Sequence, residues 1–305
     1  MHDLKYKIIF FILLGLSFVV GCISHFATTT ENFNASDYAN SYERGKNLAF
    51  NICGQCHYDA SVNRFTGKPM NDLPSFMGKV YSANLTHSAK FGVLDKYTDA
   101  ELAYLLKTGI TREGKYTPYM IRPNLADTDI SNITIYFRSK DTAVLASDKI
   151  AGKSKVNLLG RAATKVAGKP LPYRKGIPMP AETDTLAYGR YLVDNLACYH
   201  CHSKSIIGLD YLQPEKSKGY LQGGMKFKTP AGKKMYASNL TPDEKTGIGH
   251  YTRQNFREAL HKGIRPNGDS LHLPMQRFPH LTRRQCDAIF AYLKSLKPAE
   301  NKTRR

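Results

Sequence analysis

The sequence lacks an apolar run long enough to cross a bilayer as a helix. Its apolar stretch from Ile8 to Val20 is too short for that role and follows two lysines, Lys5 and Lys7. A short apolar run behind a basic start is typical of a secretory signal peptide. The letters "VVGC" at residues 19–22 then match the pattern of a lipobox, so we expect cleavage before Cys22 and lipid attachment to it. Ordinary secretion, with cleavage a few residues later, is the alternative.

Acidic residues are scarce as well. The 305 residues include 44 Lys and Arg but only 25 Asp and Glu, which gives a formal net charge of +19. Such an excess favours acidic protein partners or anionic membrane surfaces. The lysines are scattered and no nucleic-acid recognition motif accompanies them, so no nucleic-acid partner is predicted. A solvated basic surface without a docking role remains the alternative to a dedicated docking surface.

Cysteine is also rare. Only six cysteines occur, and four of them fall in two clusters, "CGQCH" at residues 53–57 and "CYHCH" at residues 198–202. Both clusters have the spacing C-x-x-C-H, the signature of c-type haem attachment. Positions i, i+3 and i+4 share one face of a helical turn, so both sulfurs can bond a porphyrin edge while the histidine meets the iron. The predicted attachment residues are Cys53, Cys56, Cys198 and Cys201, and the predicted iron ligands are His57 and His202. Because His200 has no counterpart in the first cluster, it is not expected to be a ligand.

Zinc binding is the competing interpretation of paired cysteines. A zinc site would need a second ligand pair near each cluster, and no further C-x-x-C or H-x₃₋₅-H pair follows within tens of residues. With four cysteines assigned to haem and Cys22 to lipid, Cys286 stands alone, so no disulfide is required. Export of the chain agrees with c-type haem, which is attached on the outer side of a bacterial inner membrane.

Each cluster belongs to a longer repeat. The same segments recur in the same order: "SANLT" (82–86) and "ASNLT" (237–241), "YTDAELAYLLKTGI" (97–110) and "YTRQNFREALHKGI" (251–264), "YTPYMI" (116–121) and "LHLPMQ" (271–276), "DISNITIYFRS" (129–139) and "QCDAIFAYLKS" (285–295). The interval from Asn84 to Met120 equals the interval from Asn239 to Met275. Internal duplication explains this order, and the length of the chain agrees with two domains of modest size.

Each half is predicted to form three helices joined by long loops. The first helix of each half, at 42–52 or 186–197, leads into a cluster. The expected helix-end residues are the capping boxes Thr98 with Glu101 and Thr282 with Gln285, the terminating glycines Gly109 and Gly263, and a cap at Thr183 or Thr185. The predicted fold class is therefore all-α, repeated twice.

With these helices in place, both halves resemble class I cytochrome c domains. In that family the first and last helices cross, and a loop methionine completes the iron. The residues that the resemblance places at the crossings are Gly45 and Gly189, facing Tyr136 and Tyr292. The stretch "YASNLTPDEKTGIGHYTRQNFREALHKGIRPNGDSLHLPMQRFP" (236–279) further resembles the cytochrome c subunits of membrane-bound alcohol and related dehydrogenases. The likeness covers most of residues 184–297 and is looser over 41–139. Those subunits often carry three haems, whereas two clusters occur here.

The resemblance implies a methionine as the second axial ligand of each iron. Met275 follows Pro274 and matches the family pattern, and Met120 occupies the corresponding place in the first half. Met70 and Met77 are competitors for that role, since they precede the middle helix as Met225 and Met235 do in the second half. Met179 is expected to belong to the linker. Asn84 and Asn239, each beside "LT", are expected either to bond a haem propionate or to brace a turn.

The predicted domain boundaries follow from the repeat. We expect a lipoprotein signal peptide at 1–21, a tether at 22–38, cytochrome c domain 1 at 39–140, a linker at 141–182, domain 2 at 183–299 and a basic tail at 300–305. The proline-rich part of the linker, 168–180, is expected to be extended and to lie against the domains. The chain is expected to be exported, on the periplasmic side, and lipid-anchored to a bacterial membrane.

The predicted function is electron transfer by two covalently bound haem c groups, without catalysis. The expected donor is a periplasmic or membrane dehydrogenase, and the expected acceptor is another cytochrome or a terminal oxidase. Both partners are expected to bind this basic chain through acidic docking surfaces. A dihaem redox enzyme is the alternative. A peroxidase would need an open haem, and a thiosulfate dehydrogenase would need a cysteine ligand such as Cys286. That position matches Ile130 of the first repeat, which indicates a core residue.

Overall fold

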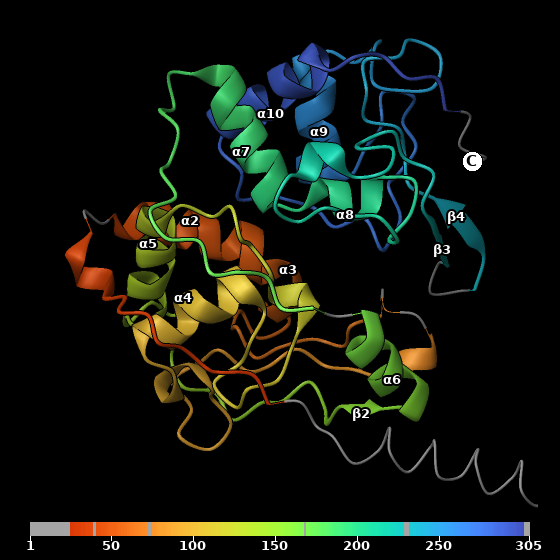
Figure 1. The fold of residues 1–305 in the computed structure, drawn as a ribbon. Helices are drawn as coiled ribbons and strands as arrows, with labels where there is room; N and C mark the ends of the chain where they lie inside the picture. The colour runs from red at the N-terminus through yellow and green to blue at the C-terminus, as the bar shows by residue number, and fades with distance from the viewer. Residues whose placement is uncertain are drawn as a thin grey trace, which may run out of the picture.

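The computed structural model describes residues 25–38, 41–71, 73, 75–167, 169–228 and 232–301. Its helices form two groups, one from each half of the chain, which lie one above the other in Figure 1. The predicted signal peptide and Cys22 lie outside the described residues. Within the described ranges, no helix is both long enough and apolar enough to cross a bilayer.

The secondary structure is dominated by helices. The first half contains α2 (Tyr42–Leu48), the π-helical segment η2 (Ala49–Cys53), α3 (Gly54–His57), α4 (Asp99–Thr108) and α5 (Asp127–Phe137). The linker contains α6 (Leu158–Ala167), and the second half contains α7 (Thr185–Asn195), α8 (Cys198–His202), α9 (Arg253–Lys262) and α10 (Arg283–Ser295). Short 3₁₀ turns lie at Ala35–Asp37, Ser75–Met77, Leu94–Lys96, Pro118–Met120 and Pro214–Lys216. The helix-rich fold that the sequence predicts is confirmed.

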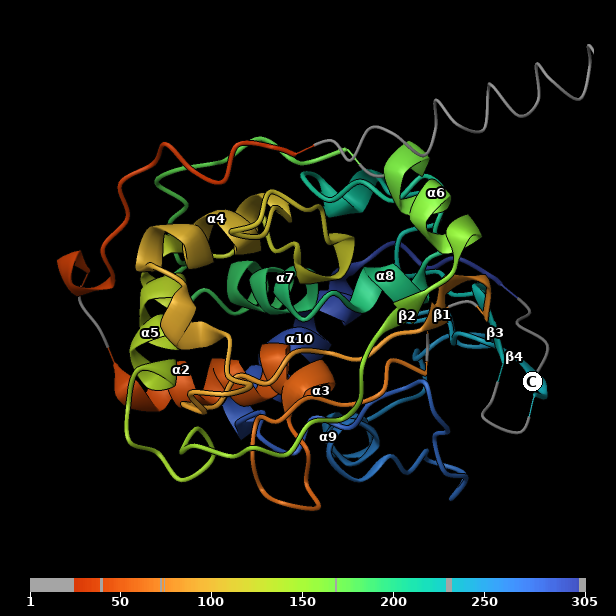
Figure 2. The same cartoon turned by 90° about the horizontal axis from the view of Figure 1, so that it is seen from below.

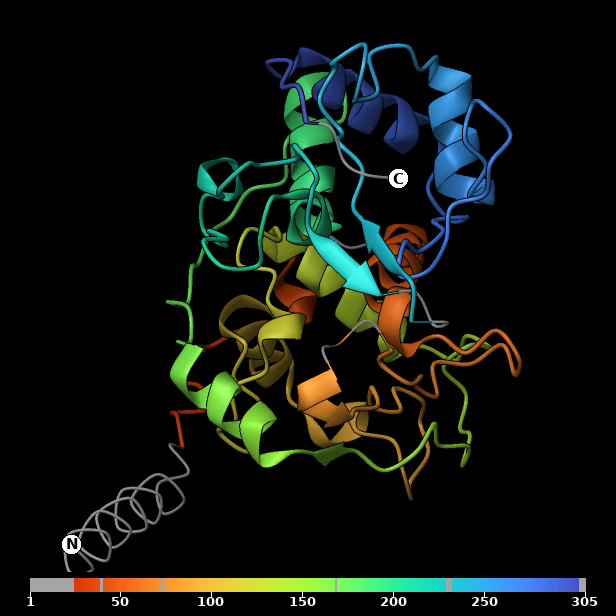
Figure 3. The ribbon, with the colours of Figure 1, turned by 90° about the vertical axis from the view of Figure 1, so that its right-hand side faces the viewer.

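Two small antiparallel sheets accompany the helices. Strand β1 (Gly78–Lys79) pairs with β2 (Lys155–Val156), so a segment before α4 joins the linker beside α6. Figure 2 shows β1, β2 and α6 together at one edge of the molecule. Strand β3 (Lys226–Lys228) pairs with β4 (Lys234–Tyr236), and Figure 3 shows this hairpin in cyan. Neither sheet was expected from the sequence.

The first and last helices of each half cross at a glycine, as expected. A Cβ atom on Gly45 would lie 2.0 Å from the carbonyl oxygen of Asn132, and one on Gly189 would lie 2.0 Å from that of Ala288. Tyr136 and Tyr292 contact the same two crossings through their Cβ atoms. Since only glycine permits so close an approach, α2 packs on α5 and α7 packs on α10 in the same manner.

Most of the predicted helix ends are confirmed. Capping boxes are present at Thr98 with Glu101 and at Thr282 with Gln285, and Gly109 and Gly263 end α4 and α9 in the left-handed conformation. The expected cap of α7 at Thr183 or Thr185 is wrong. Asp184 takes that place, because its carboxylate accepts a hydrogen bond from the backbone N–H of Ala187 at 3.0 Å. A carboxylate at this position also interacts favourably with the helix dipole.

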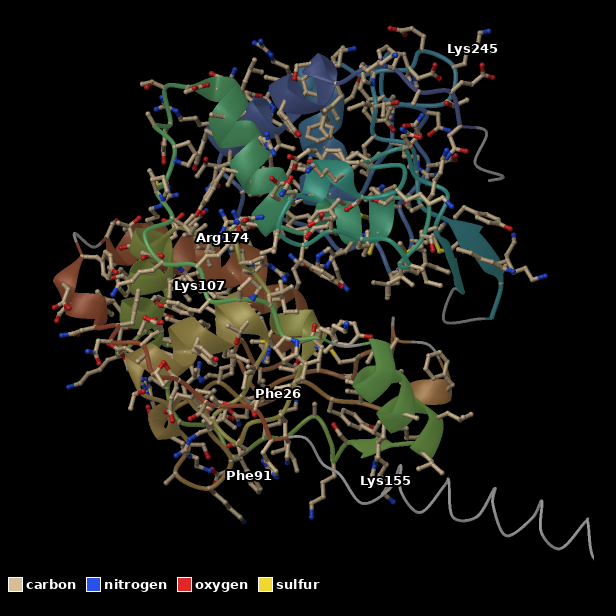
Figure 4. All side chains as sticks on the ribbon, viewed as in Figure 1. Phe26, Phe91, Lys107, Lys155, Arg174 and Lys245 are labelled. Atoms are coloured by element: carbon tan, nitrogen blue, oxygen red, sulfur yellow. The ribbon has the colours of Figure 1, made fainter. Side chains whose placement is uncertain are left out.

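The linker lies along the first half before it reaches α7. Residues 169–180 have no regular secondary structure, as predicted for the proline-rich part, whereas α6 is a helix that the sequence did not predict. Lys107 of α4 donates both to the carboxylate of Asp127 and to the carbonyl oxygen of Arg174. Figure 4 shows Lys107 and Arg174 on adjacent segments. The backbone N–H of Gly176 also donates to Asp127, at 2.9 Å, so this buried ion pair fixes the linker to α4 and α5.

Candidate functional site

Both C-x-x-C-H clusters lie on short helices at the end of the helix that crosses its partner. In the first half, Cys53 ends the π-helical segment η2, and α3 carries Cys56 and His57. In the second half, all three residues lie on α8, which is separated from α7 by Ala197 in the left-handed conformation. The local backbones therefore differ, although the order of residues is the same.

The two cluster histidines are oriented in the same way. Nδ1 of His57 lies 2.8 Å from the carbonyl oxygen of Ala83, and Nδ1 of His202 lies 2.8 Å from the carbonyl oxygen of Ser238. A carbonyl can only accept, so in both rings Nδ1 carries the proton. Nε2 is then left with a lone pair, which is the arrangement that a metal-ligating histidine needs.

Burial keeps these groups uncharged. It lowers the pKa of His57 and of His202, so both imidazoles are neutral at physiological pH. Burial also raises the pKa of the Cys53 and Cys198 thiols to about 12. A neutral imidazole is the form that binds iron.

The backbone of each cluster histidine accepts a hydrogen bond from a glycine in a nearby turn. The backbone N–H of Gly67 donates to the carbonyl oxygen of His57 at 2.9 Å, and that of Gly223 donates to His202 at 2.6 Å. Both glycines have positive φ, and a Cβ on Gly67 would lie 2.3 Å from the carbonyl oxygen of Ser82. The close approach brings the segment that bonds each histidine ring against its cluster, and a side chain at either glycine would separate them.

Asn84 and Asn239 brace turns, one of the two alternatives considered for them. Oδ1 of Asn84 accepts from the backbone N–H of Thr86 at 2.8 Å, and its Nδ2 donates to the carbonyl of Ser147 at 2.8 Å. Asn239 makes the same contacts with Thr241, at 2.9 Å, and with the carbonyl of Ala299, at 2.7 Å. Each amide is thus satisfied within the protein, and each ties its turn to the segment that follows the last helix.

Met120 and Met275 lie in corresponding loops. The N–H of Thr117 donates to the carbonyl of Gly109 at 2.7 Å, and the N–H of Leu271 donates to that of Gly263 at 2.6 Å. Each methionine lies a few residues after this hydrogen bond. Its side chain is half-buried and packs against the hydrophobic core. The repeat therefore places both side chains at the same point of the fold, between the middle and last helices.

The competing methionines lie elsewhere in the fold. Met70 pairs through its backbone with Val80 at 2.9 Å, and Met225 of the second half pairs in a similar way with Ala237 at 2.9 Å. Met77 lies under α6, where a Cβ on Gly160 would come within 2.8 Å of its Cα. Met77 is thus engaged with the linker helix.

Zinc coordination receives no support from the geometry. Structural zinc takes four converging ligands, and catalytic zinc takes three. In the described part of the chain, no group of three or more His, Cys, Asp or Glu side chains converges in a way that could hold a metal ion. Covalent haem attachment requires no such convergence, because only the histidine of each cluster binds iron.

Two residues that are not proposed as ligands, Cys286 and His200, pack against neighbouring side chains. Cys286 is fully buried on α10, with its Sγ 3.3 Å from Nε2 of His261. His200 packs edge-on against Tyr199 and Tyr211, with ring centroids 4.5 and 5.1 Å away, and burial lowers its pKa to about 3. The burial of Cys286 agrees with the expectation that it is a core residue.

Sequence reasoning missed the contacts between the two halves at the clusters. Nε of Arg122 donates to the carbonyl oxygen of Asn195 at 2.8 Å, and Nε2 of Gln55 donates to the carbonyl oxygen of Arg277 at 3.2 Å. Arg122 and Arg277 each stand two positions after the predicted methionine ligand. That coincidence in the repeat was the available signal, although the sequence does not show which residues of the other half they meet.

Comparison with known proteins identifies relatives of part of the chain, although no family model matches it. The cytochrome subunit of fructose dehydrogenase from Gluconobacter japonicus is 30% identical over 126 residues, which are 40% of this chain and 24% of that protein. The cytochrome c subunit of a quinone alcohol dehydrogenase from Gluconacetobacter polyoxogenes is 32% identical over 114 residues, 37% of this chain and 22% of that protein. The cytochrome c subunit of gluconate 2-dehydrogenase from Pantoea cypripedii is 32% identical over 106 residues, 34% of this chain and 21% of that protein.

The chain spans about a quarter, or slightly less, of the length of these relatives. The resemblance predicted from the sequence is confirmed, since all three are cytochrome subunits of dehydrogenases. Over more than a third of its length, the chain is therefore a homologue of the cytochrome c subunits of bacterial fructose, alcohol and gluconate dehydrogenases.

Proposed function

We propose that the chain is a dihaem c-type cytochrome that carries electrons and changes no substrate. The observation that supports this proposal most strongly occurs twice. In each half, a C-x-x-C-H cluster contains a neutral histidine whose Nδ1–H is fixed by a backbone carbonyl, which leaves Nε2 for iron. The cytochrome c relatives support covalently bound haem c as the cofactor.

The four cysteines and four axial residues have separate roles in this proposal. Cys53 and Cys56 hold one haem, Cys198 and Cys201 hold the other, His57 and His202 are the proximal ligands, and Met120 and Met275 are the distal ligands. When bound, haem iron supplies one-electron exchange between its ferrous and ferric states. The histidine and methionine pair favours a high reduction potential, because the soft thioether stabilises ferrous iron.

The protein contributes orientation, neutrality and exclusion of water. Ala83 and Ser238 set the rotation of the two histidine rings, and burial prevents protonation of the imidazoles in competition with iron. His57 and Met120 would hold one iron and His202 and Met275 the other, so no coordination site would be left for oxygen or peroxide. In this role the chain carries electrons and does not act as an enzyme.

We assign each haem to one class I cytochrome c domain, at 39–140 and 183–299, joined by the linker at 141–182. The repeated crossing at Gly45 and Gly189 supports this division, as do the capping boxes at corresponding places in the two halves. The linker contact through Lys107 supports an arrangement in which the linker lies against domain 1.

The proposed partners are a dehydrogenase as donor and a cytochrome or terminal oxidase as acceptor. The names of the relatives support a dehydrogenase complex, and the net charge of +19 supports docking to acidic surfaces. We place the protein on the periplasmic side of a bacterial membrane, held through lipid on Cys22 and the tether at 22–38. The short apolar run and "VVGC" support this location.

A redox enzyme of the thiosulfate dehydrogenase type receives less support. Its cysteine ligand would have to be Cys286, whose thiol is fully buried on α10 beside His261 and matches Ile130 of the first half. Ile130 is fully buried too, so the two positions share a core role. A cysteine in such a place acts as a small apolar side chain.

Visible and near-infrared spectroscopy of the purified protein tests the proposed function. Two low-spin haems, each with the sulfur-to-iron charge-transfer absorption of methionine ligation, are the expected result. Addition of peroxide should leave the ferric spectrum unchanged. A high-spin haem that reacts with peroxide would contradict the carrier and favour a dihaem peroxidase.

A further inference from the structure

The two clusters contact each other's halves in a reciprocal way. Gln55, between the cysteines of the first cluster, bonds the carbonyl of Arg277, two residues after Met275. Asn195, three residues before the second cluster, accepts from Arg122, two residues after Met120. In each case, the region of one cluster contacts the arginine that stands two positions after the proposed methionine ligand of the other half. The reciprocal contacts place both clusters at one interface.

Arg122 lies at this interface. Its Nε donates to Asn195 of the second half at 2.8 Å, and its Nη1 donates to the carbonyl of Ile121 at 2.7 Å. These partners are carbonyl oxygens and carry no charge. Among the ion pairs of the described residues, none includes Arg122 within 4.0 Å, so its positive charge is not neutralised by a nearby carboxylate.

The same guanidinium affects the pKa of one thiol in each cluster. Burial raises the pKa of Cys53, and the positive charge of Arg122 opposes that rise. Burial likewise raises the pKa of Cys198, as do the charges of Asp194 and Cys201, and Arg122 opposes the rise with a smaller contribution. Burial lowers the pKa of Arg122 itself, but arginine remains protonated in proteins. One half-buried positive charge therefore acts on both proposed haem attachment sites.

We propose that Arg122 is a positioning residue shared by the two haem sites, which raises both reduction potentials and holds the two clusters together. This inference rests on the proposed dihaem function. Oxidation of haem iron adds one positive charge, so a fixed cation nearby favours the ferrous state. A unit charge about 10 Å from another, at an effective dielectric constant of about 20, changes such an equilibrium by on the order of tenfold. Reducing both haems is therefore easier with Arg122 present.

Redox titration of the haem-loaded protein tests the proposal through Arg122→Gln and Arg122→Lys. Arg122→Gln removes the charge and should lower both midpoint potentials, so that the ferrous-to-ferric ratio at a fixed potential falls about tenfold, or about 59 mV for a one-electron couple. Arg122→Lys keeps the charge and should retain most of both potentials, although the carbonyl hydrogen bonds change. A shift of only one haem in Arg122→Gln, or of neither, would overturn the shared role.

Arg277→Gln is the matched control. Arg277 holds the corresponding position in the second half, but its side chain is exposed and only its backbone carbonyl meets the first cluster. Water screens an exposed charge, so Arg277→Gln should leave both potentials close to those of the unchanged protein. An equal drop in Arg277→Gln and Arg122→Gln would show that net charge alone, and not the place of Arg122, sets the potentials.

A measurement on the unchanged protein covers the case in which Arg122→Gln fails to fold. Electron paramagnetic resonance of the fully oxidised protein should show magnetic coupling between two ferric haems, because both clusters meet at Arg122. Two haems without any coupling would overturn the inference while leaving the dihaem function intact. A protein with fewer than two haems by mass would instead contradict the proposed function itself.

Discussion

Nζ of Lys46 lies 2.8 Å from Oδ2 of Asp141, and this ion pair joins α2 to the segment that follows α5. Asp141 also accepts from the hydroxyl of Tyr42 at 2.7 Å and from the backbone N–H of Ala143 at 2.8 Å. Burial alone would raise the pKa of Asp141, but these donors more than offset it, and the pKa is lowered to about 2. The ionised carboxylate therefore stabilises the fold.

Asp141 should make the first half sensitive to acid. The carboxyl has a pKa of about 3.9 in an unfolded chain, so its stabilisation is complete above about pH 4 and is lost as the pH falls through about 2. Asp141→Asn should remove on the order of 2 kcal/mol at pH 6 and weaken the loss of stability between pH 4 and pH 2. Denaturant unfolding at several pH values measures both. The exposed Asp269→Asn serves as control, and an unchanged acid slope in Asp141→Asn would refute the assignment.

The helix crossing at Gly45 predicts a second effect on stability. Gly45→Ala would place a methyl group 2.0 Å from the carbonyl oxygen of Asn132, so α2 must move away from α5. We expect a loss of about 1–3 kcal/mol in the free energy of unfolding. Gly54→Ala is the control, since its Cβ would meet its nearest neighbour at an ordinary 3.5 Å. Equal losses in the two variants would contradict the close crossing.

The local features of the fold were predictable because they are encoded by neighbouring residues. Thr98 with Glu101 and Gly109 define the ends of α4 without any contact from elsewhere in the chain. The resemblance to class I cytochrome c domains implied the crossing at Gly45, and a glycine recurs at the corresponding position, Gly189. In these cases the physical requirement, a cap or a close approach, leaves a direct mark on the residue type.

Features that depend on distant segments were not predictable. Helix α6 packs against the 3₁₀ turn at Ser75–Met77, and β2 pairs with β1, so both depend on a segment far back in the sequence. The contact between Arg122 and Asn195 depends on how the halves stack, which no local pattern records. Thr183, Asp184 and Thr185 are all good capping residues, and only the path of the linker selects Asp184.

The distal ligand of the first haem is the site assignment most open to test. Met120→Ala should erase about half of the sulfur-to-iron charge-transfer absorption and lower the potential of one haem, because a weaker ligand stabilises ferrous iron less. Met70→Ala and Met77→Ala are the controls and should leave the absorption intact. Loss of absorption in either control, with Met120→Ala unaffected, would show that the repeat aligns the wrong methionine.

Lipid attachment can be tested separately from haem binding. Cys22→Ser should abolish lipid modification and release the protein into the soluble fraction, while its haem content stays the same, because Cys22 is not part of either cluster. Membrane fractionation and the mass of the N-terminal peptide give the result. A mature protein that begins downstream of Cys22 and carries no lipid would mean that ordinary secretion replaces the lipid anchor.

The mass of the intact, denatured protein tests the dihaem assignment most directly, because thioether-linked haem survives denaturation. The unchanged protein should carry two haem additions. Replacement of Cys198 and Cys201 together by alanine should remove one addition, and the same change at Cys53 and Cys56 should remove the other. A single haem in the unchanged protein, or two haems in either double variant, would contradict the account.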